Sequence, residues 1–130
     1  MAINLNGLGQ IALGVRDVDA SERFYADVLG LRKLFRFGAL SFLDMAGLRL
    51  LLEQSREGTR IEHGAVLYFR VADIVLARAA LESRGLMFTD QIHRIAEMED
   101  HDLWMTFFRD PDEHILALMM EAPKGWERGS

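Results

Sequence analysis

An internal repeat constrains the fold of this chain more than any other feature of its sequence. Each copy has the same order: an alternating apolar run, an acidic residue, an amphipathic stretch, a glycine and three further β-like runs. The matched residues are Val15 and Val71, Asp17 and Asp73, and Gly30 and Gly85. Because one copy cannot bury its sheet alone, the repeat predicts two copies packed as a pair.

The first copy reads as a βαβββ module over residues 8–55. The stretch "IALGV" at residues 11–15 alternates as a half-buried strand does. Asp19 and Glu22 have the spacing of a capping box for the helix that follows, and Gly30 suits the end of that helix. The runs "LRKLFRFG", "ALSFL" and "LRLLLE" then supply three strands.

The second copy, residues 63–121, follows the same order. "AVLYFRV" predicts a strand, Asp73 a helix cap and "IVLARAALESR" a helix. The polar segment "HRIAEMEDHD", which contains His93 and His101, is expected to be a solvated loop. Residues 122–130 are expected to fray or to cross to a partner. Together the copies predict a single α+β domain in which two βαβββ modules form a curled mixed sheet around a cavity, with the helices outside.

Composition excludes several classes of function. The chain of 130 residues contains no cysteine, which excludes disulfides and thiolate metal sites and favours a reducing, cytoplasmic location. Its net charge of −5, with no dense basic stripe, argues against nucleic acid or an anionic membrane as partner. The first residues lack the pattern of a signal peptide, and the longest apolar run, 115–120, is far shorter than a bilayer span.

Two motifs resemble the vicinal oxygen chelate superfamily, which includes glyoxalase I, extradiol dioxygenases and the bleomycin-resistance and fosfomycin-resistance proteins. They are "QIALGVRDVDASERFYADVLGL" near the start and "FFRDPDEHILAL" near the end. The resemblance spans roughly residues 8–121 and implies the glyoxalase fold. It does not specify an activity, because this fold carries several unrelated chemistries.

The resemblance also implies where a metal-using member would place four ligands, two in each module. In this chain those positions hold Gln10, Leu51, Val66 and Ala117. Val66 and Ala117 carry no donor atom, whereas a catalytic divalent ion needs about three protein ligands. Glu53 lies two residues beyond Leu51 and reaches the site only if the strand register slips. We therefore expect no metal and no cofactor.

Strand alternation sorts the side chains that are expected to face the cavity. A four-residue turn, Asp110–Glu113, would pair Ile115 with Phe108, so that Ala117 faces the cavity together with the side chains opposite it. The resulting wall is apolar with a few polar groups, which suits a small organic ligand. Arg49 belongs to this wall, and the predicted ligand-binding residues are Gln10, Glu53, Tyr68, Arg70, Trp104 and Thr106.

Several of these residues have a structural alternative. Trp104 can serve as a core or dimer contact instead of a ligand platform, and Tyr68 as a hydrogen-bonded core residue. Arg49 and Arg70 can pair with Glu53 across the sheet. His114, which follows the "DPDE" turn, is expected at the surface.

Two functions compete at this point. The first is a metal-free protein that binds a small organic molecule, as bleomycin-resistance members of the superfamily do. The alternative is a metal-dependent lyase, isomerase or dioxygenase in which Gln10 and Glu53 act as ligands. In either case open sheet edges and the resemblance favour a homodimer.

Overall fold

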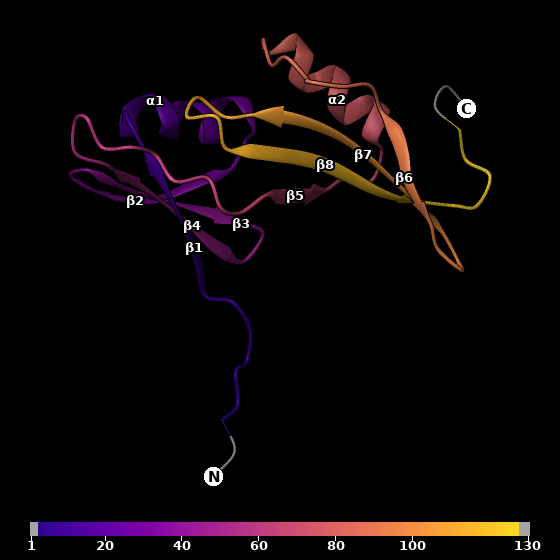
Figure 1. The fold of residues 1–130 in the computed structure, drawn as a ribbon, viewed down its shortest axis with the longest axis horizontal. Coiled ribbons are helices and arrows are strands. Elements are labelled where there is room, and N and C mark those ends of the chain that lie inside the picture. The colour runs from indigo at the N-terminus through magenta and orange to yellow at the C-terminus, as the bar shows by residue number, and fades with distance from the viewer. Residues whose placement is uncertain (1–2, 128–130) are drawn as a thin grey trace. The chain divides into compact units, whose positions relative to one another are not determined.

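The computed structural model describes residues 3–127 and divides the chain into two units, Met1–Glu62 and His63–Ser130. We call them module 1 and module 2. Each unit is a βαβββ module with one four-stranded mixed sheet (Figure 1). The predicted α+β class, with two tandem modules, is confirmed. No helix in the described part of the chain is long and apolar enough to span a membrane.

Module 1 has strand order β1-β4-β3-β2. Strand β1 pairs with β4 in parallel, and the other two pairings are antiparallel. Helix α1 continues into a π-helical turn, η1, in which the Leu29 N–H donates to the Phe24 carbonyl. The elements are β1 (Gln10–Val15), α1 (Val18–Arg23), η1 (Phe24–Val28), β2 (Arg32–Phe37), β3 (Leu40–Met45) and β4 (Leu48–Gln54).

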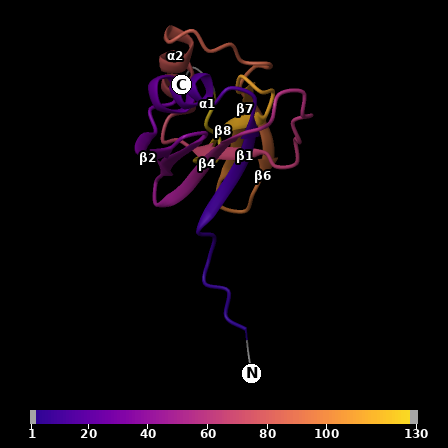
Figure 2. The ribbon, with the colours of Figure 1, turned by 90° about the vertical axis from the view of Figure 1, so that its left-hand side faces the viewer.

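The module 1 sheet buries one face against its helix. Leu13 and Val15 of β1 and Leu50 and Leu52 of β4 are buried on this side, as the alternation of β1 predicts. We call it the helix face, and we call the opposite side the helix-distal face. The segment before β1 runs away from the sheet in an extended conformation (Figures 1 and 2). Its apolar side chains Ile3, Leu5 and Leu8 are exposed.

The cap of α1 differs from the prediction. Asp17, and not Asp19, caps the helix: its carboxylate accepts from the N–H groups of Asp19 and Ala20 at 3.0 and 3.2 Å. Glu22 does not complete a capping box, because its carboxylate accepts instead from Ser41 Oγ of β3 at 2.6 Å. The internal repeat pointed to the right residue, since Asp17 matches Asp73, which caps α2.

Module 2 repeats the topology with strand order β5-β8-β7-β6. Gly85 follows its helix with φ +91, and Gly30 follows the helix of module 1 with φ +82, so both predicted terminators adopt the left-handed conformation that glycine permits. The elements are β5 (Leu67–Arg70), α2 (Ile74–Ser83), β6 (His93–Glu97), β7 (Asp102–Arg109) and β8 (Ile115–Ala122).

Two predictions for module 2 are wrong. The segment "HRIAEMEDHD" is not one solvated loop, because His93–Glu97 form β6 and only the turn closed by Met98 N–H and the His101 carbonyl remains. The prediction that the tail frays is also wrong for residues 123–127, because Lys124 Nζ binds the Met98 carbonyl and Asp102 of the same module at 2.8 and 3.0 Å. Residues 128–130 of that predicted tail lie outside the described part of the chain.

The hairpin that joins β7 to β8 also differs from the prediction. Arg109 pairs with Ile115, so the turn has one residue more than the four expected. Asp110 closes it by accepting from the N–H groups of Asp112 and His114 at 2.9 Å each, and Glu113 adopts φ +70. His114 is 2% exposed instead of lying at the surface. A shift of one residue moves every side chain of a strand to the other face.

Candidate functional site

The helix-distal face of module 1 carries a group of exposed aromatic side chains. Phe35 stacks on Phe42 with ring centroids 4.4 Å apart and meets Phe37 edge-on at 5.5 Å. Phe35 pairs with Phe42 across β2 and β3, and Leu51 lies beside Phe42 on β4. We call Phe35, Phe37 and Phe42 the phenylalanine platform. Phe37 is 66% exposed and Phe35 is 44% exposed, so the platform is an apolar surface open to a ligand.

A polar pair adjoins this platform. Arg49 Nε donates to Gln10 Oε1 at 2.9 Å, and the Arg49 guanidinium lies over the Phe42 ring at 5.6 Å. Both residues lie on the predicted face, because Gln10 pairs with Arg49 across β1 and β4. The remaining N–H groups of a guanidinium are suited to bind a carboxylate or another anionic oxygen.

Glu53 lies on the same face but far from Gln10. It pairs with Gly14, four residues along β1 from Gln10, which corresponds to roughly 13 Å at the rise of a strand. The register shows no slip that would bring Glu53 to the first ligand position. The two side chains that the alternative function would use as ligands are thus too far apart to share one ion.

The other positions that the superfamily uses for a metal do not fit one either. Gln10 Oε1 already accepts a hydrogen bond from the cationic Arg49, and Leu51 and Ala117 carry no donor atom. Val66, just before β5, is equally apolar. The described residues contain no cluster of three or more histidine, cysteine or acidic side chains that could hold an ion. The donor set therefore does not match a catalytic metal.

The helix-distal face of module 2 carries Tyr68 and Arg70. Tyr68 is 48% exposed and packs edge-on against Phe107 with centroids 6.1 Å apart. Arg70 Nε lies 3.8 Å from a carboxylate oxygen of Glu121. The alternative in which Arg49 pairs with Glu53 is thus wrong, since its partner is Gln10, and within module 2 Arg70 pairs with Glu121.

Trp104 and Thr106 lie on the other face of the module 2 sheet. Thr106 pairs with Leu118 and not with Ala117, because of the longer hairpin. Its buried hydroxyl accepts from Arg78 at 2.7 Å and donates to Asp90 at 3.0 Å, so both of its roles are taken within the module. The predicted placement of Trp104 and Thr106 beside Ala117 is therefore wrong, whereas Gln10, Glu53, Tyr68 and Arg70 do lie on helix-distal faces.

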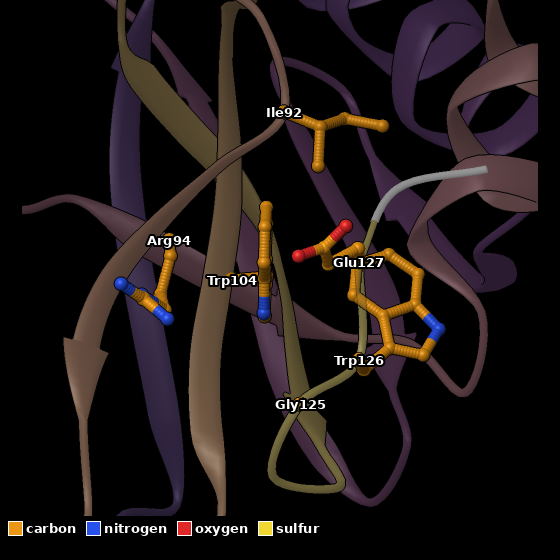
Figure 3. A pocket seen from close by; sticks show the side chains of 6 residues that line it. All are labelled: Ile92, Arg94, Trp104, Gly125, Trp126 and Glu127. Carbon is orange, nitrogen blue, oxygen red and sulfur yellow. The ribbon is translucent and has the colours of Figure 1, made fainter. Parts of the chain in front are cut away.

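Trp104 lines a separate pocket of about 450 Å³ on the helix face of module 2 (Figure 3). Its ring meets that of Trp126 at 5.0 Å and 78°, and its buried Nε1 has no acceptor among the described residues. Sequence reasoning missed Trp126 because the tail has no periodicity. It also missed Phe35 and Phe37, although the phenylalanines of "FRF" alternate along β2 as side chains of one face do.

The histidine side chains contact nearby oxygens or rings of module 2. His93 Nδ1 lies 2.7 Å from the Gln91 carbonyl oxygen, and His101 Nδ1 lies 2.7 Å from Asp100 Oδ1. The hydrogen bond from His101 lowers the pKa of Asp100 from its ordinary value. His63 Nε2 lies 2.7 Å from the Asp112 carbonyl, and its ring is 5.0 Å from that of His114.

Comparison with known proteins agrees with this architecture. The model of the Glyoxalase/Bleomycin resistance protein/Dioxygenase superfamily matches residues 7–118, and the chain belongs to this superfamily. None of the curated proteins matches the chain.

Solved structures with the same fold are numerous. A lactoylglutathione lyase from Agrobacterium tumefaciens is 22% identical with a TM-score of 0.71, over 95% of this chain and all (100%) of that one. A glyoxalase/bleomycin resistance protein/dioxygenase from Alicyclobacillus acidocaldarius is 21% identical with a TM-score of 0.72, over 89% and 92%. An integron cassette protein from V. cholerae is 19% identical with a TM-score of 0.74, over 92% and 98%. At these identities the likeness concerns the fold alone.

Proposed function

We propose that this chain binds a small organic molecule on the helix-distal face of module 1, with the phenylalanine platform as the main contact and no divalent ion required. The observation that carries the proposal is the exposure of Phe35 and Phe37. Aromatic surface left in water costs about 25 cal/mol for each Å² that a ligand could cover, so a flat apolar molecule gains free energy by stacking there.

The charged neighbours indicate the polar part of the ligand. Arg49 lies over Phe42 and uses its Nε for Gln10, so a ligand could accept from its outer guanidinium N–H groups. A flat molecule that carries a carboxylate or sulfonate therefore matches the platform and Arg49 together. Gln10 orients Arg49 in this proposal, and Glu53 is a further polar group of the same face. Tyr68 and Arg70 are the corresponding polar groups on the helix-distal face of module 2.

The test uses 8-anilinonaphthalene-1-sulfonate, a flat aromatic anion that fluoresces when it leaves water. We expect saturable binding that is unchanged by EDTA. Phe37→Ser should weaken it about 10-fold, since one stacking aromatic contributes roughly 1–1.5 kcal/mol. The matched control is Leu76→Ser on α2, because Leu76 is 67% exposed and Phe37 is 66% exposed.

Two results would contradict the proposal. One is an equal loss for Leu76→Ser, which would mean that the probe binds exposed apolar side chains without preference. The other is stoichiometric uptake of nickel, zinc, iron or manganese together with loss of probe binding in EDTA, which would favour the metal-dependent lyase or dioxygenase instead.

We also propose that the chain forms a homodimer. Ile3, Leu5 and Leu8 are exposed on the extended segment before β1, and apolar side chains of this kind favour contact with a second chain. Light scattering should give twice the monomer mass for the natural chain and the monomer mass for the double variant Leu5→Ser, Leu8→Ser. A natural chain that scatters as a monomer at micromolar concentration would exclude the dimer.

A further inference from the structure

The pocket on the helix face of module 2 combines two tryptophans with charged side chains. It is formed where the residues after β8 turn back over β6 and β7 (Figure 3). A turn closed by the Trp126 N–H and the Pro123 carbonyl, together with Gly125 at φ +84, returns the chain toward β7. The lining residues are Ile92, Arg94, Trp104, Gly125, Trp126 and Glu127.

The two indoles form the walls of a corner. Their planes are 78° apart and their centroids are 5.0 Å apart, and both rings line the pocket. The face of an indole carries the negative end of the ring quadrupole, which attracts cations. A corner of two such faces favours a compact cation that touches both.

The two charged side chains that line the pocket, Arg94 and Glu127, differ in their ion pairs. Arg94 lies on the neighbouring strand and pairs with Glu97, with Nη1 3.2 Å from the carboxylate oxygen. Lys124 is likewise matched by Asp102 at 3.0 Å. Glu127 makes no ion pair with any residue of the described chain, and its carboxylate lies beside the Trp104 ring in Figure 3.

We infer that this pocket binds a small organic cation of the quaternary or alkylated ammonium type, held by the faces of Trp104 and Trp126 and by the carboxylate of Glu127. Such cations have a large, weakly hydrated surface, so they lose little hydration when they contact aromatic faces. A volume of about 450 Å³ accommodates a molecule of the size of choline. This site is on the helix face and is separate from the phenylalanine platform.

The test takes advantage of the tryptophan content. The chain has two tryptophans, and both line this pocket, so intrinsic tryptophan fluorescence reports on this site. We expect choline to change the emission saturably. Its uncharged isostere 3,3-dimethylbutan-1-ol, which has the same shape with carbon in place of nitrogen, should bind at least 10-fold more weakly.

Three variants separate the contributions. Glu127→Gln should weaken choline binding about 10-fold and make it less sensitive to salt. Trp126→Leu should weaken it by at least as much, read by calorimetry because the fluorophore is changed. Arg94→Gln should leave Glu97 unpaired and strengthen binding several-fold. The matched control is Glu121→Gln, which removes an equal charge from β8 outside the lining of the pocket and should have no effect.

Several outcomes would overturn the inference. Equal affinity for choline and its isostere would show that shape alone is recognised, and an unchanged affinity in Glu127→Gln would remove the role of the carboxylate. Binding only to vesicles of phosphatidylcholine, with none to free choline, would identify a membrane surface instead of a small molecule. Failure of this site leaves 8-anilinonaphthalene-1-sulfonate binding at the platform unaffected, so the two proposals are tested separately.

Discussion

In each module a hydroxyl of the sheet binds a charged side chain of the helix. That side chain is an acid in module 1 and an arginine in module 2. In module 1 the hydroxyl of Ser41, on β3, donates to the acid Glu22 of α1, and that acid also lies 3.3 Å from Arg36 of β2. In module 2 the hydroxyl of Thr106, on β7, accepts from Arg78 of α2 and donates to Asp90 before β6. Both hydroxyls are buried on the helix face.

The arginines at these two helix–sheet contacts, Arg78 and Arg36, differ in burial, and this difference decides how much each contact contributes to stability. Arg78 is 13% exposed; it also donates to the Asp90 carbonyl at 2.7 Å and lies 4.5 Å over the ring of Phe88. The cation of module 1, Arg36, is more exposed, and hydrogen bonding to Asp19 raises its pKa above the usual value. Removing Arg78 leaves buried polar groups without a partner, whereas water can reach the groups around the more exposed Arg36.

Arg78→Met should therefore have the largest effect. It keeps the aliphatic stem but removes the donor to Thr106 and Asp90, and we expect a loss of about 3 kcal/mol in the free energy of unfolding. Urea unfolding followed by tryptophan fluorescence measures it in module 2, where both tryptophans lie. A loss below 1 kcal/mol would mean that the contacts of Arg78 contribute no more than a surface ion pair.

Removal of the two hydroxyls sharpens the comparison. Ser41→Ala removes one donated hydrogen bond and leaves Glu22 with Arg36, so we expect a loss of about 1 kcal/mol. Thr106→Val keeps the shape but removes both an accepted and a donated bond, so about 2 kcal/mol should be lost. Equal losses in urea unfolding followed by circular dichroism would show that the second hydrogen bond is without effect.

The β3–β4 hairpin and the β7–β8 hairpin differ in turn length, and each contains a non-glycine residue with positive φ. The β3–β4 turn consists of Ala46 and Gly47, since Met45 pairs with Leu48, and both turn residues have positive φ as a two-residue hairpin requires. The β7–β8 turn holds a positive φ at Glu113 alone among its residues. Each of these non-glycine residues is strained in the left-handed region.

Glycine should relieve this strain. Ala46→Gly should stabilise the chain by about 0.5 kcal/mol after the entropy of glycine in the unfolded state is subtracted. Glu113→Gly should gain less, because it also removes the contact between Glu113 and Arg109 at 3.8 Å. Thermal unfolding measures both, and Ala46→Val, which should lower the midpoint, is the control for the conformation.

The hairpins also explain how far the sequence could predict the site. The face of module 1 was predictable because alternation and a short turn agree, and Gln10 and Glu53 lie on the expected side. In module 2 the side chain of Asp110 bridges two N–H groups and adds a residue to the turn. The hydrophobic pattern does not reveal this extra turn residue. The predicted pairing of β7 with β8 was therefore wrong by one residue, which placed Trp104 and Thr106 on the wrong face.

The cap of α1 and the tail after β8 also depend on contacts that a local sequence pattern does not reveal. The capping-box spacing of Asp19 and Glu22 was a local pattern, but Glu22 is needed by Ser41 across the sheet. The tail has glycine, proline and charge without periodicity, yet Lys124 and Trp126 attach it to module 2 through one ion pair and one ring contact. Contacts between residues distant in sequence decide these positions, and a local pattern carries no information on them.

The smallest expected effect concerns the ion pair that attaches this tail. The hydrogen bond from Lys124, opposed by the desolvation of the carboxylate, holds the pKa of Asp102 below its ordinary value of 3.8. Because the attached state has the lower pKa, the contribution of the pair is fully present above pH 3.8 and is lost as the pH falls through the lowered pKa.

Tryptophan emission should therefore stay constant from neutral pH down to about the ordinary carboxyl pKa and shift to longer wavelength only below it, as Trp126 leaves Trp104. Asp102→Asn has no charge to lose, so its emission should already be shifted at neutral pH and should lack the acid step. The carboxylates of Asp19 and Glu22 that face Arg36 lie in module 1, which contains no tryptophan, so they do not contribute to this signal. If the emission of Asp102→Asn still changed at low pH, the titration would belong to another group. Asp102 would then not be the residue that holds the tail on module 2.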